Sequence, residues 1–392
     1  MYFQSLDDRK ECVAYYDTSG EVVKEFNPAF KYTWGYAQHL NDKGVIFASL
    51  YQPKKTLEDQ CPDHLLERLR EAKRKLLGIK QSLIEAKVDT SSVCVYDLIP
   101  VHALKEFCQV KNLITKDVIE TVEKPQTYDL YVKMAQLASD IRYRKLVIDK
   151  TNLRDDWTDV RARSLYQKQL SPYIVYDFFK SKTGRATTKG GFPILNLDKR
   201  FRKIIRPTND FFVELDYNAA DIRVLWGILE EKQPKQDIHD WHQEFFKLDM
   251  SRQDAKKAFF AWLYNPDAVD IYNFGSFYDK DIFQMKYWKE GSLVNPFGVE
   301  MECDKFHFTS YLIQSTMAYM FYEQAHKLYS HLQGKQSHLA WLHHDSVVLD
   351  LADSERDLVI PLIKIFADTV FGDFKINLKL GTNYGDMRRV DV

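Results

Sequence analysis

Hydrophobic and polar positions alternate most clearly in Phe211–Arg223, where Val213 and Leu215 mark the buried side of a strand. The alanine-rich run that follows predicts a helix directly after this strand. Asp216 therefore lies at a strand end, where its carboxylate is displayed at the edge of a sheet, as a metal ligand would be.

A second segment of this kind is Trp341–Leu351, in which two apolar half-strands flank His343, His344 and Asp345. This pattern predicts a tight β-hairpin with a carboxylate at its tip. Asp216 and Asp345 are far apart in the sequence, so adjacent strands of one sheet are needed to bring them together.

Two carboxylates at neighbouring strand ends repel each other unless cations bridge them, and Mg²⁺ prefers oxygen ligands. A pair of such ions would activate an attacking hydroxyl and stabilise a leaving pyrophosphate. The alternative for either aspartate alone is a helix cap or a turn former.

The remaining pattern predicts an α+β fold with antiparallel strands. Residues 15–57 mix short strands with aromatic-rich connections, as in a small α/β cap, and we interpret Tyr2–Ser5 as a cloning scar outside the fold. Helices are expected over Asp63–Asp89, Leu113–Val122 and Tyr128–Leu146, and residues 230–290 are helical and aromatic-rich. The elements expected after these are the hairpin Leu293–Met301, the helices Asp304–Leu332 and Ser354–Val370, and a final strand Lys375–Leu380.

Composition narrows the class of protein. A chain of 392 residues can bury a large core and predicts two or three domains. It has no apolar run of membrane-helix length and no signal peptide, so we expect a soluble, cytoplasmic protein without membrane contacts. The five cysteines are scattered, which argues against a disulfide framework or a zinc site. Because the net charge is −1, any signal for nucleic acid has to be local.

Residues 180–206 carry such a local signal, with nine basic residues against one acid, Asp198, and with several glycines that prevent a continuous helix. A basic loop that leads into an acid-bearing strand suits a polyanion held beside a metal site. The predicted helix after Asp63 is also basic between Arg68 and Lys80, which favours contact with duplex phosphates. A solvated basic surface is the alternative for both segments.

The segment Ser251–Asn265 predicts a helix in which Ser251 and Asp254 form a capping box. Four side chains recur every four residues on one stripe, about 6 Å apart along the axis: Arg252, Lys256, Phe260 and Tyr264. Two cations near a helix N-terminus suit a triphosphate, and the aromatic rings lie where a base and a sugar would follow. The alternative is an amphipathic helix with an aromatic face in the core.

Together these motifs resemble family A DNA polymerases, the bacterial DNA polymerase I kind. They occur in the family's order: Thr183-Gly184-Arg185, the DYNAADIR segment, the R-x-x-x-K-x-x-x-F-x-x-x-Y helix, the Gln314-Ser315-Thr316 helix and the His344-Asp345 hairpin. The likeness covers about residue 63 to the end, and no Walker loop competes for the triphosphate.

The resemblance implies a right-hand polymerase fold with an antiparallel-sheet palm, helical fingers and a helical thumb. The implied ranges are an N-terminal cap or exonuclease-domain remnant at 1–60, the thumb at 61–150, the palm at 151–225 and 293–392, and the fingers at 226–292.

The resemblance also implies a role for each site residue. Asp216 and Asp345 would be catalytic and would bind two Mg²⁺ ions, for which Mn²⁺ can substitute, with help from the Tyr217 carbonyl. The residues implied for the incoming deoxynucleoside triphosphate are Arg252 and Lys256 on the triphosphate, Phe260 on the sugar, Tyr264 at the templating position and Asp221 beside the ribose 2′ position. Those implied for primer–template DNA are Arg185, Asn196 and Gln314 in the minor groove and His344 at the primer terminus.

Three departures from the family stand out. Asp221 is one methylene shorter than the usual glutamate, Asn265 replaces a glycine, and Ser346 replaces the acid that normally follows the catalytic aspartate. We therefore expect looser discrimination against ribonucleotides, and metal binding without a third carboxylate.

The function expected is a compact, phage-like DNA polymerase that extends a primer and lacks a full exonuclease domain. Proofreading would come from a separate exonuclease, and a helicase or processivity protein is a possible further partner. The alternatives are a single-subunit RNA polymerase, which Asp221 disfavours, a non-catalytic DNA-binding subunit, suggested by Ser346 and Asn265, and a metal-dependent nuclease, which needs no triphosphate site.

Overall fold

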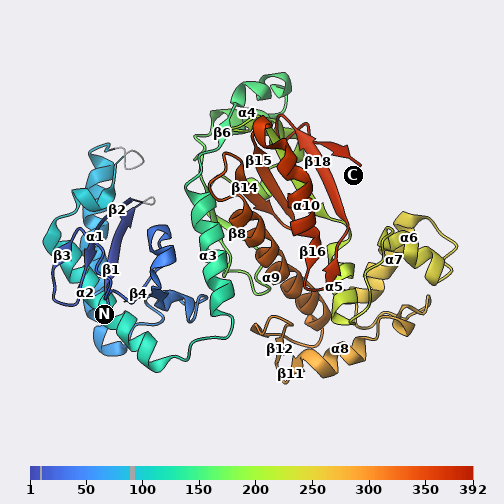
Figure 1. Ribbon diagram of the computed structural model, residues 1–392, viewed down its shortest axis with the longest axis horizontal. Helices are drawn as coiled ribbons and strands as arrows, with labels where there is room; N and C mark the ends of the chain where they lie inside the picture. The colour runs from blue at the N-terminus through green and yellow to red at the C-terminus, as the bar shows by residue number, and fades with distance from the viewer. Residues whose placement is uncertain (9–10, 89–92, 392) are drawn as a thin grey trace. The chain divides into compact units, whose positions relative to one another are not determined.

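The computed structural model describes residues 1–8, 11–88 and 93–391 (Figure 1). The chain divides into two compact units, Met1–Tyr143 and Arg144–Val392. The sequence prediction separated residues 1–60 from the helical region after them, whereas the structure joins both in the first unit. The boundaries predicted inside the second unit stay a prediction. Across the described ranges, no helix is long and apolar enough to cross a membrane.

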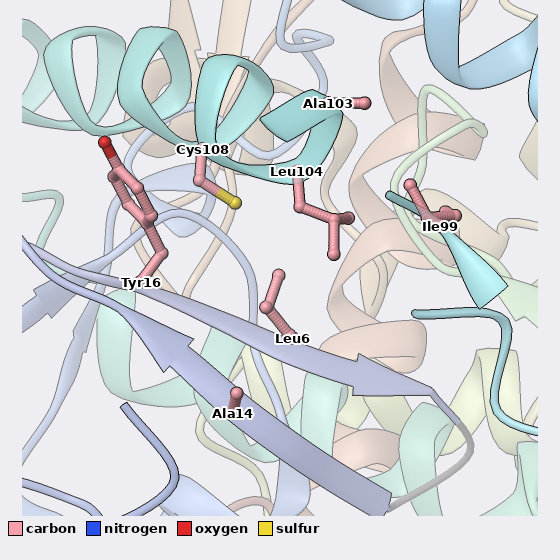
Figure 2. Close-up of a cluster of buried hydrophobic side chains, with 7 residues drawn as sticks. All are labelled: Leu6, Ala14, Tyr16, Ile99, Ala103, Leu104 and Cys108. Atoms are coloured by element: carbon pink, nitrogen blue, oxygen red, sulfur yellow. The ribbon is translucent and has the colours of Figure 1, made fainter. Parts of the chain in front are cut away.

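The first unit is built on a short antiparallel sheet, in the order β1 (Gln4–Asp8), β2 (Glu11–Tyr16) and β3 (Val22–Val23). Side chains from β1 and β2 pack against the start of a helix and the residues before it (Figure 2). Burial of this apolar cluster stabilises the contact between the N-terminal strands and the helix. Its members are Leu6, Ala14, Tyr16, Ile99, Ala103, Leu104 and Cys108.

The interpretation of Tyr2–Ser5 as a scar outside the fold is wrong. Phe3 is fully buried within an aromatic cluster. Gln4 is buried as well, and its side-chain amide donates to Asn112 Oδ1 at 3.0 Å and to Thr115 Oγ1 at 3.1 Å. Because a buried amide without partners is costly, these bonds tie the first strand to the helix that carries Asn112 and Thr115.

The helices of the first unit are α1 (Asp63–Glu85), α2 (Val101–Thr121) and α3 (Tyr128–Arg142). All three were predicted, although the predicted end of the first, Asp89, lies outside the described residues. Helix α2 begins well before the predicted start because its buried positions already recur at helical spacing from Ala103. A parallel pair, β4 (Tyr32–Thr33) and β5 (Ile46–Phe47), completes the strands of this unit.

A five-stranded antiparallel sheet forms the centre of the second unit (Figure 1). Its order is β14 (His338–His343), β15 (Ser346–Leu351), β10 (Phe211–Tyr217), β18 (Ile376–Gly381) and β19 (Arg388–Val390). The predicted antiparallel α+β arrangement is confirmed. The strand expected to be last is β18, and β19 was missed because its three residues are all exposed and lack an apolar alternation.

Helix α9 (Phe308–His331) packs against both α5 (Ala220–Ile228) and α10 (Val359–Ala367), and α9 and α10 lie across the sheet (Figure 1). The Tyr217 ring of β10 stacks on Phe366 of α10, with 4.2 Å between the centroids. Phe212 packs instead against Trp341 on the opposite side. Since successive side chains of a strand point to opposite faces, Asp216 shares the face of Phe212 and points away from α10.

Smaller elements complete the second unit. The remaining strand pairs are β6 (Val147–Ile148) with β9 (Ile205–Arg206), β7 (Ile174–Asp177) with β8 (Thr187–Gly191), and β16 (Asp368–Thr369) with β17 (Gly372–Asp373). The predicted hairpin at Leu293–Met301 is confirmed by β12 (Ser292–Val294) and β13 (Glu300–Glu302), which β11 (Trp288–Lys289) extends. The other helices are α4 (Val160–Gln167), α6 (Ile238–Phe245), α7 (Arg252–Tyr264) and α8 (Lys280–Tyr287).

Candidate active site

Of the two predicted metal-binding aspartates, Asp216 lies on β10 and Asp345 directly precedes the neighbouring strand β15. Asp216, near the end of β10, is paired with Ser346 on one side and Asn377 on the other. The main-chain N–H of Tyr217 donates to the carbonyl oxygen of Asp345 at 3.5 Å. Both aspartates line one cavity of about 350 Å³. The structure thus brings together two carboxylates that the sequence placed only at separate strand ends.

A strained two-residue loop holds Asp345 at the tip of the β14–β15 hairpin. His344 and Asp345 connect His343 to Ser346, which face each other across the ladder. His344 has a φ of 58°, a left-handed conformation that costs a non-glycine residue about 1–3 kcal/mol. The Ser346 hydroxyl donates to the His343 carbonyl at 3.0 Å. The predicted tight hairpin with an acid at its tip is confirmed, and its strain lies directly beside the acid.

Both carboxylates are partly buried, and neither forms an ion pair with a basic side chain in the described part of the chain. Burial raises the pKa of Asp216 to about 6, and the charge of Asp345 adds to this, while a hydrogen bond from Asn377 Nδ2 at 3.0 Å opposes it. Burial also raises the pKa of Asp345. Two adjacent acids with raised pKa values gain from a divalent cation, which would relieve their repulsion.

Tyr217 can offer only its main chain to a metal. Its side-chain hydroxyl donates to the Phe366 carbonyl at 2.8 Å, on the helix-covered face of the sheet. The metal donors predicted from the sequence, the carboxylates of Asp216 and Asp345 and the main chain of Tyr217, all belong to residues that line the cavity, and the carboxylate-bearing Asp221 lines it too. A set made only of oxygen donors fits Mg²⁺ or Mn²⁺.

Helix α7 begins at the predicted cap. The Ser251 side-chain oxygen accepts a hydrogen bond from the main-chain N–H of Asp254 at 3.2 Å, and its hydroxyl donates to the Asp254 carboxylate at 2.7 Å. The acid thus contacts the hydroxyl of Ser251, whereas a capping box would have it accept from the Ser251 main-chain N–H. The cap fixes the first turn of the helix, from which the stripe of cations and rings extends.

The stripe on α7 faces the cavity that both aspartates line. Phe260 lies between a cation and a second ring: the Lys256 Nζ is 5.9 Å from its centroid, and the Tyr264 ring stacks on it at 5.7 Å. The lining residues from this helix are Arg252, Lys256 and Phe260. Two cations and an aromatic ring therefore share one cavity with two carboxylates.

Arg252 is already paired with a carboxylate. Its guanidinium donates to Asp237 at 2.6 and 3.2 Å and lies 3.3 Å from Asp240. The Asn218 amide also donates to Asp237, at 3.2 Å, so this acid links α6, α7 and the turn after β10. Burial alone would raise the pKa of Asp237, but the bonds from Arg252 and Asn218 hold it well below its ordinary value. Any anion that Arg252 binds has to compete with Asp237.

Asp221, in the first turn of α5, also lines the cavity. Its carboxylate accepts a hydrogen bond from the Tyr264 hydroxyl at 2.9 Å and pairs with Arg185 at 3.4 Å. Burial, with the charge of Asp221, raises the pKa of Tyr264, which keeps this hydroxyl protonated. Asp221 thereby joins the end of α7 to the basic 180–206 segment.

The residues predicted to contact DNA are not among those that line the cavity. Asn196 is exposed in a short 3₁₀ turn, and Gln314 is half-buried on α9. His344 is exposed at the hairpin tip, and Arg185 pairs with Asp221. Contact of these four residues with DNA stays a prediction.

Sequence reasoning missed three residues that line the cavity, Asn218, His239 and Asn377. It also missed Asp237, which bonds to two lining residues, Asn218 and Arg252. His239 is buried beside Phe260, and its Nδ1 has no hydrogen-bond partner among the described residues. Burial, with the nearby charge of Lys256, lowers its pKa to about 4, so it is neutral at pH 7. Asp237 could have been recognised as a helix N-cap, but its contact with Arg252 depends on how two helices pack.

Comparison with solved structures finds this fold in the POL domain of Pol1 from M. smegmatis, which was solved in complex with DNA primer-template and dNTP. The TM-score is 0.66, the match covers 98% of this chain and 96% of that chain, and the two sequences are 11% identical. No family model matches this chain, and neither does any curated protein. The likeness establishes a fold similar to that of a polymerase domain.

Proposed function

We propose that this chain is a template-directed DNA polymerase that adds deoxynucleotides to a primer 3′ end by two-metal-ion nucleotidyl transfer. One observation carries the proposal: the cavity that holds Asp216 and Asp345 is also lined by Arg252, Lys256 and Phe260 of α7. The fold supports it, because the similar POL domain was solved with DNA primer-template and dNTP. A nuclease would need the acids but not the cationic helix.

In the proposed reaction each group has a distinct task. Asp216, Asp345 and the Tyr217 carbonyl would hold two Mg²⁺ ions, or Mn²⁺ in their place. Activation of the primer 3′-hydroxyl and stabilisation of the leaving pyrophosphate are the chemistry that such ions supply when bound. Arg252 exchanges Asp237 for the triphosphate, and Lys256 binds one helical turn further along, about 6 Å away.

The proposal extends to the organisation of the chain. We assign the thumb to 61–150, the palm to 151–225 and 293–392, and the fingers to 226–292, with residues 1–60 as a cap. The match of 98% of this chain to a POL domain supports a polymerase-like domain over the length of the sequence. A separate exonuclease, a helicase or a processivity protein would be further partners.

Extension of an end-labelled primer on a defined template tests the proposal. We expect longer products only with the complementary deoxynucleotide and a divalent metal. Shorter products would identify a nuclease, extension with ribonucleotides alone an RNA polymerase, and unchanged primer with retained DNA binding a non-catalytic subunit.

Variants of α7 test the triphosphate contacts in the same assay. Arg252→Ala and Lys256→Ala should each raise the KM for the nucleotide at least tenfold, because each removes a cation from the cavity. Lys257→Ala is the matched control, since Lys257 is exposed on the same helix and pairs with Asp254. A KM that changes equally in all three variants would contradict the assignment.

A further inference from the structure

A second cluster of reactive groups lies in the first unit, around Cys12 on β2. Ser5 Oγ is 3.7 Å from Cys12 Sγ and 3.2 Å from His39 Nε2. The other ring nitrogen of His39 lies 3.6 Å from Asp7 Oδ2, and the Tyr15 ring centroid is 5.9 Å from that of His39. A thiol, an imidazole and a carboxylate are thus gathered in a unit to which the proposed polymerisation assigns no chemistry.

A β-bulge creates this cluster. The register of β1 and β2 pairs Leu6 with Ala14 but Asp7 with Cys12, so that one extra residue stands on β2. Regular alternation would place Cys12 on the same face as Ala14, in the apolar core shown in Figure 2. The bulge instead turns Cys12 to the face of Ser5 and Asp7.

We propose that Cys12 is a reactive thiolate, paired with the imidazolium of His39, and that it is a site of modification by hydroperoxides. The arrangement resembles activated cysteines in general, in which a nearby cationic histidine stabilises the thiolate. Cys12 is half-buried, so part of its surface is open to small reagents. The proposal does not depend on the polymerase function, because its groups all belong to the first unit.

The electrostatics of the cluster favour the charged pair. Burial opposes ionisation of Cys12, but hydrogen bonds with His39, Tyr15 and Ser5 lower its pKa overall. Burial likewise opposes charge on His39, whereas Asp7 and Cys12 raise its pKa to about 9. One contact opposes ionisation of Cys12, because the protonated thiol donates a hydrogen bond to the Ala14 carbonyl at 3.4 Å. The titratable groups of the described residues that face the thiol are Asp7 of β1, Tyr15 of β2 and His39 of the 3₁₀ helix Gln38–Lys43.

Cys12 and His39 supply the electrons and the proton that reaction with a hydroperoxide needs. The thiolate sulfur of Cys12 attacks the terminal oxygen, so that a sulfur–oxygen bond forms while the oxygen–oxygen bond breaks. Sulfur is oxidised by two electrons to a sulfenic acid, and the peroxide is reduced to an alkoxide. The His39 imidazolium gives its proton to that alkoxide, which leaves as an alcohol, and His39 becomes neutral.

Alkylation of the full chain by iodoacetamide, resolved by peptide mass spectrometry, tests the pair. Cys61 is the internal control, because it is also half-buried while burial and Glu58 raise its pKa. At pH 7 we expect Cys12 to react at least tenfold faster than Cys61, with a rate that rises less steeply than that of Cys61 between pH 6.5 and 8. His39→Gln should slow Cys12 at least tenfold and leave Cys61 unchanged.

Two results would overturn the proposal. One is an alkylation rate of Cys12 that rises tenfold per pH unit, in parallel with the rate of Cys61. This result is measured on the unsubstituted protein, so it does not depend on whether His39→Gln folds. The other is failure of tert-butyl hydroperoxide to produce a dimedone-reactive sulfenic acid at Cys12 under conditions in which a free low-pKa thiol reacts. Sulfenic acid at Cys12 and not at Cys61 supports the proposal.

Discussion

Asp216 carries a charge that its burial disfavours. Its pKa of about 6 exceeds the ordinary value of 3.8, so the folded state binds the proton more tightly than the unfolded state does. The contribution of Asp216 to the free energy of unfolding should therefore fall as the pH rises from about 4 to 6 and stay low above that range. A shift of two units corresponds to at most about 3 kcal/mol.

Asp216→Asn removes this charge and keeps the shape of the side chain. In the presence of a chelator we expect the variant to exceed the original protein in stability at pH 7.5 by up to about 3 kcal/mol, with the difference gone near pH 4. Urea unfolding at both pH values measures it, and exposed Asp357→Asn is the control. Equal stability at pH 7.5 would show that the buried charge costs nothing.

Asp221 is the residue most able to make nucleotide selection unusual. Its carboxylate is held by Tyr264 and Arg185 and is one methylene shorter than the family's glutamate. We predict weak discrimination between ribo- and deoxyribonucleotides, and at least tenfold stronger discrimination in Asp221→Glu, because the longer acid would fill the space for a 2′-hydroxyl. Single-nucleotide insertion kinetics measure both ratios. A strong deoxyribonucleotide preference in the unsubstituted protein would rule this idea out.

At the scale of elements, an ion pair between Asp237, the N-cap of α6, and Arg252 joins α6 to α7. Asp237 both caps α6, through the main-chain N–H groups of His239 and Asp240, and pairs with Arg252. Asp237→Asn separates these roles, since asparagine caps helices equally well but lacks the charge. We expect tripolyphosphate to bind at least threefold more tightly to the variant, as measured by calorimetry. Unchanged or weaker binding would mean that Asp237 positions Arg252 and does not compete for it.

Elements with local causes were predictable from the sequence. The strand–helix junction at Asp216, the hairpin at Asp345 and the capped helix α7 each follow from periodicity and caps within one segment. His239 and Asn377 were missed because their importance arises from tertiary packing: one lies in a helix and the other in a strand, and neither segment is distinctive. Strand β19 was missed because it is short and wholly exposed.

At the scale of the whole molecule, the sequence limited the possible folds but did not determine strand order. The hairpin required β14 and β15 to be neighbours, whereas the insertion of β10 between β15 and β18 depends on contacts between distant segments. The fold of the first unit was harder to predict from the sequence than that of the second. Residues 2–5 were set aside as a scar, although Phe3 and Gln4 are buried.

The basic helix α1 is partly neutralised within its own unit. Lys75 pairs with Glu106 at 3.1 Å and with Glu71 at 3.3 Å, and Lys73 pairs with Glu58. Arg74 and Lys80 are exposed and form no ion pair with any described residue. If α1 contacts duplex phosphates, these two side chains are the best placed to do so.

We therefore predict that Arg74→Gln with Lys80→Gln weakens DNA binding uniformly across sequences. The slope of log affinity against log salt should become shallower by about 2, because each lost phosphate contact contributes about 0.9. Lys75→Gln is the control and should change the slope less. Fluorescence anisotropy with duplex DNA at several salt concentrations measures it, and an unaltered slope in the double variant would refute the contact.

The central claim is that Asp216 and Asp345 form the metal site of a polymerase. Primer extension by Asp345→Asn, compared with Asp357→Asn and with DNA binding measured in parallel, tests it most directly. The account predicts that Asp345→Asn loses at least a thousandfold in Mg²⁺-dependent extension while binding primer–template normally, and that Asp357→Asn extends as the original protein does. Extension by Asp345→Asn at the original rate would contradict the account.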